Sequence, residues 1–314
     1  MLSILLPVYN ISAEPLVNAL LEQARRLSVP FEILILDDAS PDRQSVIENE
    51  KMAENPEVTF LCNETNCGRS FTRNRLADTA QYPYLLFIDG DAGIRSHDYL
   101  EQYISHARMR HSDTSERFVT MGGVSYHETP PEKAYRLRWH YGINREQKSA
   151  AQRLQHPYRS FTPFNMLVSK AVFNICRFDE SFKTYGFEDV FFGEQLRSNG
   201  IPVEHIDNGI YHDGLDQNEV FLSKTETAVA NLAQLLNEQK ATPDFIRENR
   251  LLHTFLKLSD WHLSRPAELF LNINRRTLKK LVLQRYNLRA LDLYKLLCLF
   301  QDTREEHSKE RTEQ

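Results

Sequence analysis

Two carboxylates separated by a single glycine, Asp89 and Asp91, follow an apolar run in the segment LLFIDGDAGI. Like charges this close destabilise each other unless a cation or a set of donors neutralises them. Mg²⁺ and similar cations bind one or two carboxylates together with substrate phosphates. The alternative is a hairpin, because Asp-Gly is a favoured two-residue turn. The next segment, AGIRSHDYLEQYI, predicts a loop and a helix instead of a matching strand, which favours the cation site.

The elements that position these acids are predicted by an alternation of apolar runs and helical spacing over about ninety residues. LSILLPV, FEILILDDAS, EVTFLCN and LLFIDGD predict strands, and SAEPLVNALLEQARRL and GRSFTRNRLADTA predict helices between them. This pattern is typical of an α/β domain with a mostly parallel sheet. Ligands of such sheets bind beyond the carboxyl ends of the strands. Six polar residues fall at those ends: Asn10, Asp37, Asp38, Asn66, Asp89 and Asp91.

The later part of the chain changes character twice. VTMGGVSY, FNMLVSKAVF and GIPVEHIDNGIYH predict further strands, and EDVFFGEQLRSNG predicts a helix that ends at Gly200. From Thr242 to Phe300 the chain is expected to be helical, and the charged end is expected to be disordered. We therefore predict a sheet domain over residues 1–215, a helical region over 216–300 and a tail over 301–314.

Composition narrows the class of protein. The chain has 314 residues, of which 41% are hydrophobic and 26% charged, and its net charge is −5. A nucleic-acid partner is not expected, because nucleic-acid binding requires a basic face. The four cysteines show no C-x-x-C spacing, so neither a zinc site nor a disulfide framework is indicated. No apolar run reaches the ~20 residues of a membrane span, and MLSILLPVYN lacks the features of a signal peptide. We expect a cytoplasmic protein.

Five segments resemble the motifs of the family 2 glycosyltransferases in order and approximate spacing. They are ILLPVYN, EILILDDAS, NCGRSFTRN, LLFIDGDAGI and FDESFKTYGFEDVFFGEQLRSNG. The resemblance covers about residues 1–215 and implies the Rossmann-like GT-A fold. It also implies inverting transfer of a hexose or N-acetylhexosamine from a nucleotide sugar, most simply UDP-linked, in bacterial polysaccharide synthesis. The implied cofactor is Mn²⁺ or Mg²⁺, and the implied acceptor is a glycan or a lipid-linked glycan.

The resemblance assigns the nucleotide to the ends of the first two strands. Pro7 shapes the backbone there, Tyr9 lies against the base, and Asn10 belongs to the same strand end. Stacking of a base on an aromatic ring contributes about 1–3 kcal/mol in nucleic-acid complexes. Asp38 would accept the N–H of the base. Asp37 is the structural member of this pair, with capping of the helix in SPDRQSVIENE as an alternative for an acid at this position.

The same resemblance places the diphosphate and the metal. Arg69 and Arg73 are four residues apart and share a helix face; Arg73 is the expected diphosphate ligand, and Arg69 is a candidate for a merely solvated side chain. Asp89 matches the acid nearer the ribose, and Asp91 matches the metal ligand of the D-x-D motif. His212 in GIYHDGLD stands where many GT-A enzymes have a further metal ligand, although a lone histidine is more often structural.

Glu188 and Asp189 in YGFEDVFF are the candidate catalytic acids. Displacement at an anomeric carbon requires a base for the acceptor hydroxyl, which a carboxylate supplies. Asp189 matches that base by resemblance, and Glu188 is expected to contact the acceptor. Both residues also suit the first turn of a helix, where the macrodipole favours acids; the two interpretations are compatible.

Competing hypotheses remain for the whole chain. One is a non-catalytic nucleotide-sugar or glycan-binding protein of the same fold, against which the intact set of acids and Arg73 argues. Another is a nucleotide-sugar pyrophosphorylase, which is disfavoured because PVYNISAEP has no glycine-rich phosphate loop.

Two departures from the family pattern are Ala39, where glycine is usual, and the absence of a third acid after Asp91. In the C-terminal region, NRRTLKKLVLQRYNLRALDLYKLL predicts a helical bundle, with peripheral membrane contact as a secondary hypothesis.

Overall fold

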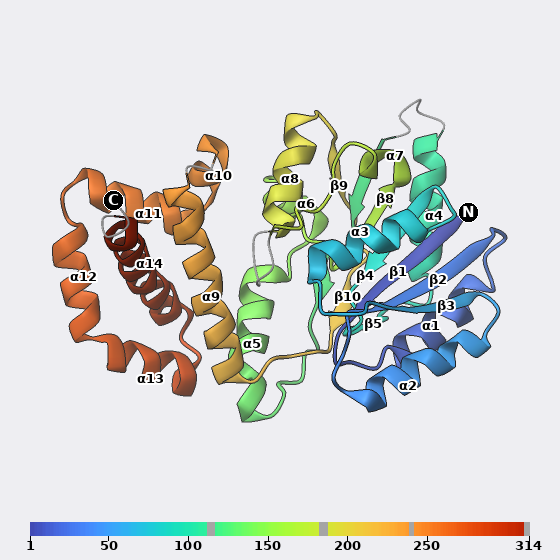
Figure 1. Cartoon of the computed structure of the whole chain (residues 1–314), viewed down its shortest axis with the longest axis horizontal. Helices are drawn as coiled ribbons and strands as arrows, with labels where there is room; N and C mark the ends of the chain where they lie inside the picture. The colour runs from blue at the N-terminus through green and yellow to red at the C-terminus, as the bar shows by residue number, and fades with distance from the viewer. Residues whose placement is uncertain (112–116, 182–187, 239–241, 311–314) are drawn as a thin grey trace. The chain divides into compact units, whose positions relative to one another are not determined.

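The computed structural model describes residues 1–111, 117–181, 188–238 and 242–310. Its elements form two compact units (Figure 1). The first unit comprises Met1–Glu128, Arg145–Lys183 and Glu188–Gly214. The second unit contains the chain from Leu215 onward and also the excursion Thr129–Asn144.

The first unit is built on a seven-stranded sheet with the strand order β3-β2-β1-β4-β8-β6-β9. Its strands are β1 (Leu2–Val8), β2 (Phe31–Asp37), β3 (Val58–Cys62), β4 (Tyr84–Ile88), β6 (Val119–Met121), β8 (Asn165–Ser169) and β9 (Val203–His205). Neighbouring strands are parallel except at β8, which runs antiparallel to both β4 and β6. The predicted α/β class and the mostly parallel sheet are confirmed.

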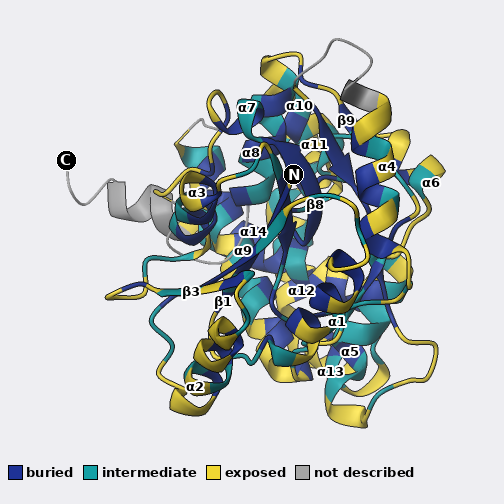
Figure 2. Cartoon of the chain, turned by 90° about the vertical axis from the view of Figure 1, so that its right-hand side faces the viewer, coloured by how far each residue is buried: buried dark blue, intermediate teal, exposed yellow. Residues whose placement is uncertain are grey.

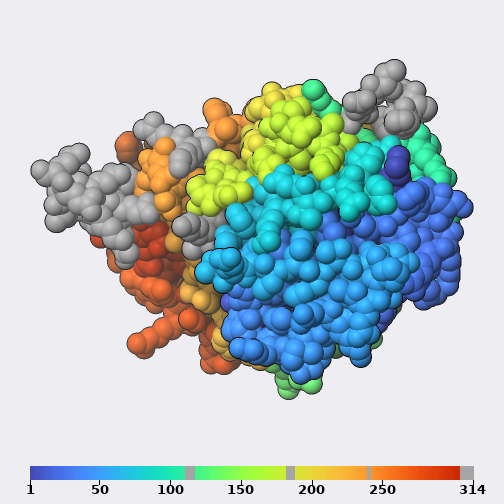
Figure 3. Space-filling view, turned by 45° about the vertical axis from the view of Figure 1, so that its right-hand side comes forward, coloured from blue at the N-terminus to red at the C-terminus, as the bar shows by residue number. Residues whose placement is uncertain are grey.

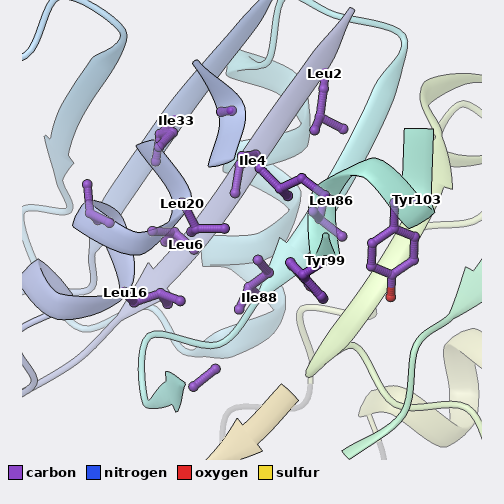
Figure 4. Close-up of a cluster of buried hydrophobic side chains, with 14 of the residues drawn as sticks. Leu2, Ile4, Leu6, Leu16, Leu20, Ile33, Leu86, Ile88, Tyr99 and Tyr103 are labelled. Atoms are coloured by element: carbon purple, nitrogen blue, oxygen red, sulfur yellow. The ribbon is translucent and has the colours of Figure 1, made fainter. Parts of the chain in front are cut away.

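Helices cover both faces of this sheet, which explains why its central strands are continuous apolar runs. The helices of the first unit are α1 (Glu14–Ala24), α2 (Arg43–Lys51), η1 (Met52–Glu54), α3 (Arg69–Thr79), α4 (Tyr99–His111), α6 (Ala150–Leu154), α7 (Lys170–Phe173) and α8 (Glu188–Ser198). Along β1, Ile4 and Leu6 pack against α1 and α4 (Figure 4). Leu5, between them, points to the opposite face and joins the core under α3, α7 and α8. Figure 2 shows the strands as a buried layer and α2 as a mostly exposed helix.

A second, three-stranded sheet lies at the end of β4 and has the order β5-β10-β7. Its strands are β5 (Ala92–Gly93), β7 (Val124–Ser125) and β10 (Ile210–His212). The expectation of one strand over VTMGGVSY was wrong, because β6 and β7 belong to different sheets. The chain turns between them at Gly122 and Gly123, and Gly123 has a φ of +91°, a conformation that glycine adopts readily.

The second unit is helical, as expected for the C-terminal region. Its helices are η2 (Lys133–Tyr135), α5 (Arg136–Tyr141), α9 (Asn218–Asn237), α10 (Pro243–Glu248), α11 (Arg250–Asp260), α12 (Ser264–Ile273), α13 (Arg275–Arg285) and α14 (Leu288–Glu310). The π-helical turn η3 (Gly142–Glu146) follows α5 and leads back into the first unit at Arg145. The buried Asn218 at the start of α9 accepts a hydrogen bond from the Leu137 backbone N–H at 2.8 Å and donates to the Lys133 carbonyl at 2.9 Å. These bonds attach the excursion to the helical unit.

Helix α14 extends into the charged segment that the sequence suggested to be disordered. Residues 301–310 continue the helix, and residues 311–314 lie outside the described part of the chain. Arg304 in this segment pairs with Glu268 of α12 at 3.1 Å, which links the helix end to the rest of the unit. No helix within the described residues is long and apolar enough to cross a membrane.

The turn after β2 keeps its shape despite the alanine at a position where glycine is usual. Ala39 has a φ of +57°, in the left-handed region that costs an L-residue about 1–2 kcal/mol. Asp37 holds this turn closed, because its carboxylate accepts hydrogen bonds from the Ser40 backbone N–H at 2.7 Å and the Ser40 hydroxyl at 2.6 Å. Asp37 is therefore a turn residue, and the N-cap of α2 is Asp42.

Replacing Ala39 with glycine is expected to stabilise the protein by about 0.5–1 kcal/mol. Glycine relieves the strain of the left-handed backbone, but it also makes the unfolded chain more flexible, which offsets part of this gain. The midpoint of urea unfolding measures the change. The matched control, Ala53→Gly at an exposed helical position in η1, is expected to be destabilising. A destabilising Ala39→Gly variant would show that this turn is not strained.

Candidate functional site

The end of β1 presents an exposed aromatic ring beside a turn held by side chains. Tyr9 is 48% exposed, while Pro7 lies within β1 opposite Leu36. Asn10 has a φ of +53°; its backbone N–H donates to the Ser40 hydroxyl at 2.7 Å, and its side-chain oxygen accepts from the Asp42 N–H at 3.1 Å. The ends of β1 and β2 are thus fixed to each other, and the Tyr9 ring is left open to solvent.

Asp38 is buried and already carries three hydrogen bonds. Its carboxylate accepts from Asn63 Nδ2 at 2.7 Å and from the backbone N–H groups of Cys67 and Gly68, each at 2.8 Å. Gly68 has a φ of +87°, which turns the chain into α3. A carboxylate has about four acceptor positions, so one remains for a further donor such as the N–H of a base. In this structure Asp38 anchors the loop before α3.

A hollow of about 330 Å³ opens at that loop. Six residues line it: Thr65, Asn66, Cys67, Gly68, Phe71 and Glu180. Figure 3 shows the surface made by this part of the chain, coloured blue to cyan, as a continuous face of the first unit. The hollow lies next to the Asp38 anchor through Cys67 and Gly68, so the anchor shapes one of its walls.

Arg73 is the centre of a buried charge network. Only 2% of the residue is exposed, and its Nη2 donates to Asp89 Oδ1 at 2.9 Å while its Nη1 lies 3.6 Å from Glu188 Oε1. Its guanidinium also lies over the Phe178 ring, 5.5 Å from the centroid. Within the described residues, Nε and Nη1 have no hydrogen-bond partner. Arg73 therefore joins α3, the end of β4 and the start of α8.

The arginines keep Asp89 ionised. Burial alone favours the neutral acid, but the positive charges of Arg73 and Arg69 outweigh burial and lower the pKa of Asp89 below its ordinary value. Arg69, one turn before Arg73, is exposed. The structure thus divides the two arginines between a buried ion pair and a position at the surface.

Asp189 has the opposite electrostatic environment. Burial, and then the negative charge of Glu188, raise the pKa of Asp189 to about 7. The Val190 backbone N–H donates to Asp189 Oδ1 at 2.8 Å. A carboxylate that titrates near neutral pH is suited to accept a proton in a reaction. The motif residues Tyr185, Gly186 and Phe187 just before this pair lie outside the described residues.

Asp91 and His212 meet across the three-stranded sheet. Pairing of His212 with Ala92 in the β10–β5 ladder brings His212 Nε2 to 3.2 Å from Asp91 Oδ2. The loop after β10 closes around Asp91, because the N–H groups of Asp213 and Gly214 both donate to the Asp91 carbonyl. A Cβ atom at Gly214 would lie 2.5 Å from the Asp91 side chain, so this approach requires glycine.

Tyr126 and Glu146 orient the His212 ring. The Tyr126 hydroxyl is hydrogen-bonded to the Glu146 carboxylate and lies 3.4 Å from His212 Nδ1. A carboxylate can only accept, so Tyr126 donates its proton to Glu146 and accepts from Nδ1–H of His212. The Tyr126 contact thus engages Nδ1, and Nε2 is the ring atom that faces Asp91. Neither Tyr126 nor Glu146 carries a sequence signal, because both reach His212 only through the fold.

The Asp91–His212 pair fits a divalent cation. Asp91 Oδ1 is buried and has no hydrogen-bond partner within the described residues, and His212 Nε2 lies beside the other carboxylate oxygen, where a deprotonated Nε2 would be available to a cation. The 3.2 Å separation of the two ligand atoms resembles that of adjacent positions around Mg²⁺, which binds oxygen at about 2.1 Å in an octahedron. In the described part of the chain, no group of three or more His, Cys, Asp or Glu side chains is arranged to hold a metal. If Asp91 and His212 were the two protein ligands, the other positions would be left to substrate phosphates and water.

The structure brings the sequence-predicted residues together in three groups. Arg73, Asp89 and Glu188 form one network with Asp189 beside it; Asp91 and His212 form a second; the end of β1 and the Asp38 anchor form the third. Asp89 and Asp91 connect the first two groups through the turn after β4. Sequence reasoning did not identify Phe178, Tyr126 or Glu146 as neighbours of these groups.

The raised pKa of Asp189 predicts a pH-dependent effect on stability. With a pKa near 7 in the folded protein and an ordinary value of 3.8 in the unfolded chain, the folded state holds the extra proton between about pH 4 and pH 7. The free energy of unfolding therefore falls as the pH rises from about 4 to about 7, because the folded protein must give up or forgo a proton that stabilises it. Asp189→Asn, which mimics the protonated acid, is expected to raise the melting temperature at pH 8 and to change it little at pH 4.

The control for this experiment is Asp98→Asn. Hydrogen bonds from Ser96 and Gln102 hold the pKa of Asp98 below its ordinary value, so the substitution is expected to lower the melting temperature at pH 8 or leave it unchanged. An Asp189→Asn variant that is equally or less stable than the parent at pH 8 would contradict the proposed environment.

Comparison with known proteins gives the family. The sequence matches the family described as "Glycosyl transferase family 2" over residues 3–174, more than half of the chain. An uncharacterized glycosyltransferase of Haemophilus influenzae is 42% identical over 92 residues, which are 29% of each protein. The validoxylamine A glucosyltransferase of Streptomyces hygroscopicus subsp. limoneus is 26% identical over 65% of this chain and 49% of its own length. The chain spans between about a quarter and a half of the length of the curated relatives it matches.

A solved structure agrees in fold. The mannosyltransferase PcManGT from Pyrobaculum calidifontis, in complex with GDP-Man and Mn²⁺, aligns over 96% of this chain and 86% of its own with a TM-score of 0.58 and 15% identity. This similarity concerns the fold alone. With the family match over most of the first unit, it leads to one conclusion: the chain belongs to glycosyl transferase family 2 and has the GT-A fold.

Proposed function

We propose that this chain is an inverting, metal-assisted glycosyltransferase that moves a hexose or N-acetylhexosamine from a nucleoside-diphosphate sugar to a glycan or lipid-linked glycan. The observation that carries the proposal is the meeting of Asp91 with His212 within two residues of the Arg73–Asp89 ion pair. Asp91 and His212, which could hold a cation, and the buried cation of Arg73 lie at the end of the same strand. Positive charge at this position would bind the negatively charged diphosphate of a donor. UDP is the proposed nucleotide and the cytoplasm the proposed compartment. Polysaccharide synthesis is the proposed process.

The donor is proposed to lie across the ends of β1, β2 and β4. Tyr9 offers its exposed ring to the base, and Asp38 offers its remaining acceptor position at the edge of the hollow before α3. Pro7 and Asn10 fix the backbone that presents Tyr9. Asp89, kept ionised by the arginines, is free to accept a ribose hydroxyl through the oxygen that Arg73 does not use.

Asp91 and His212 are the proposed ligands of Mn²⁺ or Mg²⁺. A divalent cation bound there would supply positive charge to the diphosphate as the bond to the sugar breaks. Arg73 holds Asp89 and Glu188 in place and adds to the positive potential. Arg69, exposed on the same helix face, is a second candidate for contact with the diphosphate.

Asp189 is the proposed catalytic base. The acceptor hydroxyl attacks the anomeric carbon, its proton passes to the Asp189 carboxylate, and the bond between that carbon and the diphosphate oxygen breaks, so that the configuration inverts. The elevated pKa of Asp189, about 7, supports this role, because such a carboxylate is a stronger base than an ordinary one and about half of it is still ionised at neutral pH. Glu188 is proposed to contact the acceptor.

Donor binding tests the metal pair. UDP is expected to raise the melting temperature of the protein only in the presence of Mn²⁺ or Mg²⁺, and Asp91→Ala is expected to abolish this increase, as EDTA does for the parent. GDP and other nucleotides complete the panel. Glu101→Gln, which removes an exposed carboxylate of α4, is the control and should respond like the parent. Metal-independent stabilisation by every nucleotide would count against the proposed site.

Transfer chemistry tests the base. Asp189→Asn is expected to bind the donor with the affinity of the parent and to lose about 10²–10⁴-fold in transfer rate, the usual contribution of a general base. Donor hydrolysis or transfer to a panel of glycan acceptors provides the readout. Transfer at the parental rate would show that Asp189 is not the base. Donor binding without turnover by the parent would favour the non-catalytic alternative.

A further inference from the structure

Helix α12 exposes apolar side chains on the face that surface helices normally fill with polar ones. Leu269, Phe270 and Ile273 are 63%, 66% and 75% exposed, and their spacing places them on one stripe of the helix. Leu271, on the opposite side, is buried in the helical unit. Apolar residues at such positions ordinarily face the core, so the outward stripe of α12 is not explained by packing within the unit.

The segment that leads into α12 extends this apolar surface. Trp261 is 59% exposed and Leu263 is 43% exposed. The ammonium group of Lys257 lies 4.6 Å from the centroid of the Trp261 ring, which pairs an aromatic side chain with a cation at the surface. Single exposed apolar residues are ordinary, but here five large ones fall within thirteen consecutive residues: Trp261, Leu263, Leu269, Phe270 and Ile273.

The same segment is strongly basic, although the chain as a whole is acidic. Residues 261–289 contain seven arginines and lysines and one acidic residue, Glu268, whereas the whole chain has a net charge of −5. Helix α13 follows α12 directly after Asn274, and both pack on α14 (Figure 1). All seven of these basic residues are exposed: Arg265, Arg275, Arg276, Lys279, Lys280, Arg285 and Arg289.

We propose that this α12–α13 surface, residues 261–285, binds to an anionic lipid membrane and lies in its interface. Exposed Trp, Phe, Leu and Ile beside many Lys and Arg side chains are the combination that interfacial helices use: the apolar groups enter the acyl boundary and the cations contact the lipid phosphates. The long stems of Lys and Arg let their charges remain at headgroup level while the apolar stripe is buried. This goes beyond the sequence-based hypothesis, because the exposed apolar side chains come from α12 and the segment before it, whereas α13 supplies most of the positive charge.

Membrane binding of this surface is independent of sugar transfer. Only its benefit, which is to hold the enzyme where a lipid-linked acceptor is found, rests on the proposed function. The test therefore uses the full chain without donor or metal, so that a protein inactive in transfer still reports on the surface.

Co-sedimentation with vesicles tests the proposal. The parent protein is expected to bind vesicles containing phosphatidylglycerol, to bind pure phosphatidylcholine vesicles at least about tenfold more weakly, and to dissociate from the former as salt is raised. Phe270→Ser combined with Ile273→Ser is expected to weaken binding at least about tenfold, since each loses a large inserted side chain. Lys279→Glu combined with Lys280→Glu is expected to weaken it similarly and to remove most of the salt dependence.

Exposed side chains of α2 provide matched controls in the other unit. Ile47→Ser repeats the apolar change at a position that is 58% exposed, and Arg43→Glu combined with Lys51→Glu repeats the charge reversal. Both should bind vesicles like the parent, and circular dichroism checks that every variant is folded. Failure of the parent to bind, or equal binding by the α12 variant, would overturn the proposal. A vesicle-independent dimer that Phe270→Ser and Ile273→Ser dissociate would identify a second copy of the chain as the occupant instead.

Discussion

The buried guanidinium of Arg73 is the constraint on which the candidate site depends. A charge removed from water is costly unless it is paired, and removing one partner of a buried pair typically costs about 3–5 kcal/mol. Arg73 meets this requirement with Asp89 at 2.9 Å and Glu188 at 3.6 Å. Because the three residues come from α3, the end of β4 and the start of α8, pairing this one cation fixes three separate elements, of which α8 is distant from the other two in the sequence. Asp91 and Asp189, the neighbours of the two acids, are positioned as a consequence.

The acids around Arg73 have different electrostatic environments, which shift their pKa values in opposite directions. Positive charge lowers the pKa of Asp89, whereas burial and the adjacent Glu188 raise the pKa of Asp189 to about 7. Pairs of carboxyl groups whose environments separate their pKa values in this way are suited to different tasks in one reaction. Asp89 stays ionised and can accept hydrogen bonds from a ligand, whereas Asp189 can take up a proton. Asp91 belongs to neither case, because its partner is His212, and the two side chains together are the proposed ligands of a cation.

The sequence predicted the fold of the first unit well because the strands and helices alternate with strong periodicity and the polar strand ends mark one edge of the sheet. It also led to the residues that meet at the site, since the D-x-D segment, NCGRSFTRN and the acids of α8 occur in a recognisable order. It failed where the answer depends on long-range pairing. The split of VTMGGVSY between two sheets is set by hydrogen bonds to β8 and β10. The start of the charged segment is joined to α12 through Arg304 and Glu268, a pairing that its composition does not indicate. The roles of Tyr126 and Glu146 depend on their approach to His212, which no spacing in the sequence encodes. The assignments of the site residues to donor, metal and base stay predictions.

The central claim is that Asp91 and His212 hold a cation on the diphosphate of a bound nucleotide, beside the Arg73–Asp89 pair. A crystal structure of the protein with UDP and Mn²⁺, with data collected at the manganese absorption edge, tests it most directly. The account predicts an anomalous peak in contact with Asp91, His212 Nε2 and the diphosphate oxygens, with the uracil against Tyr9. A manganese peak elsewhere, or a nucleotide bound with Asp91 and His212 still joined only to each other, would contradict it.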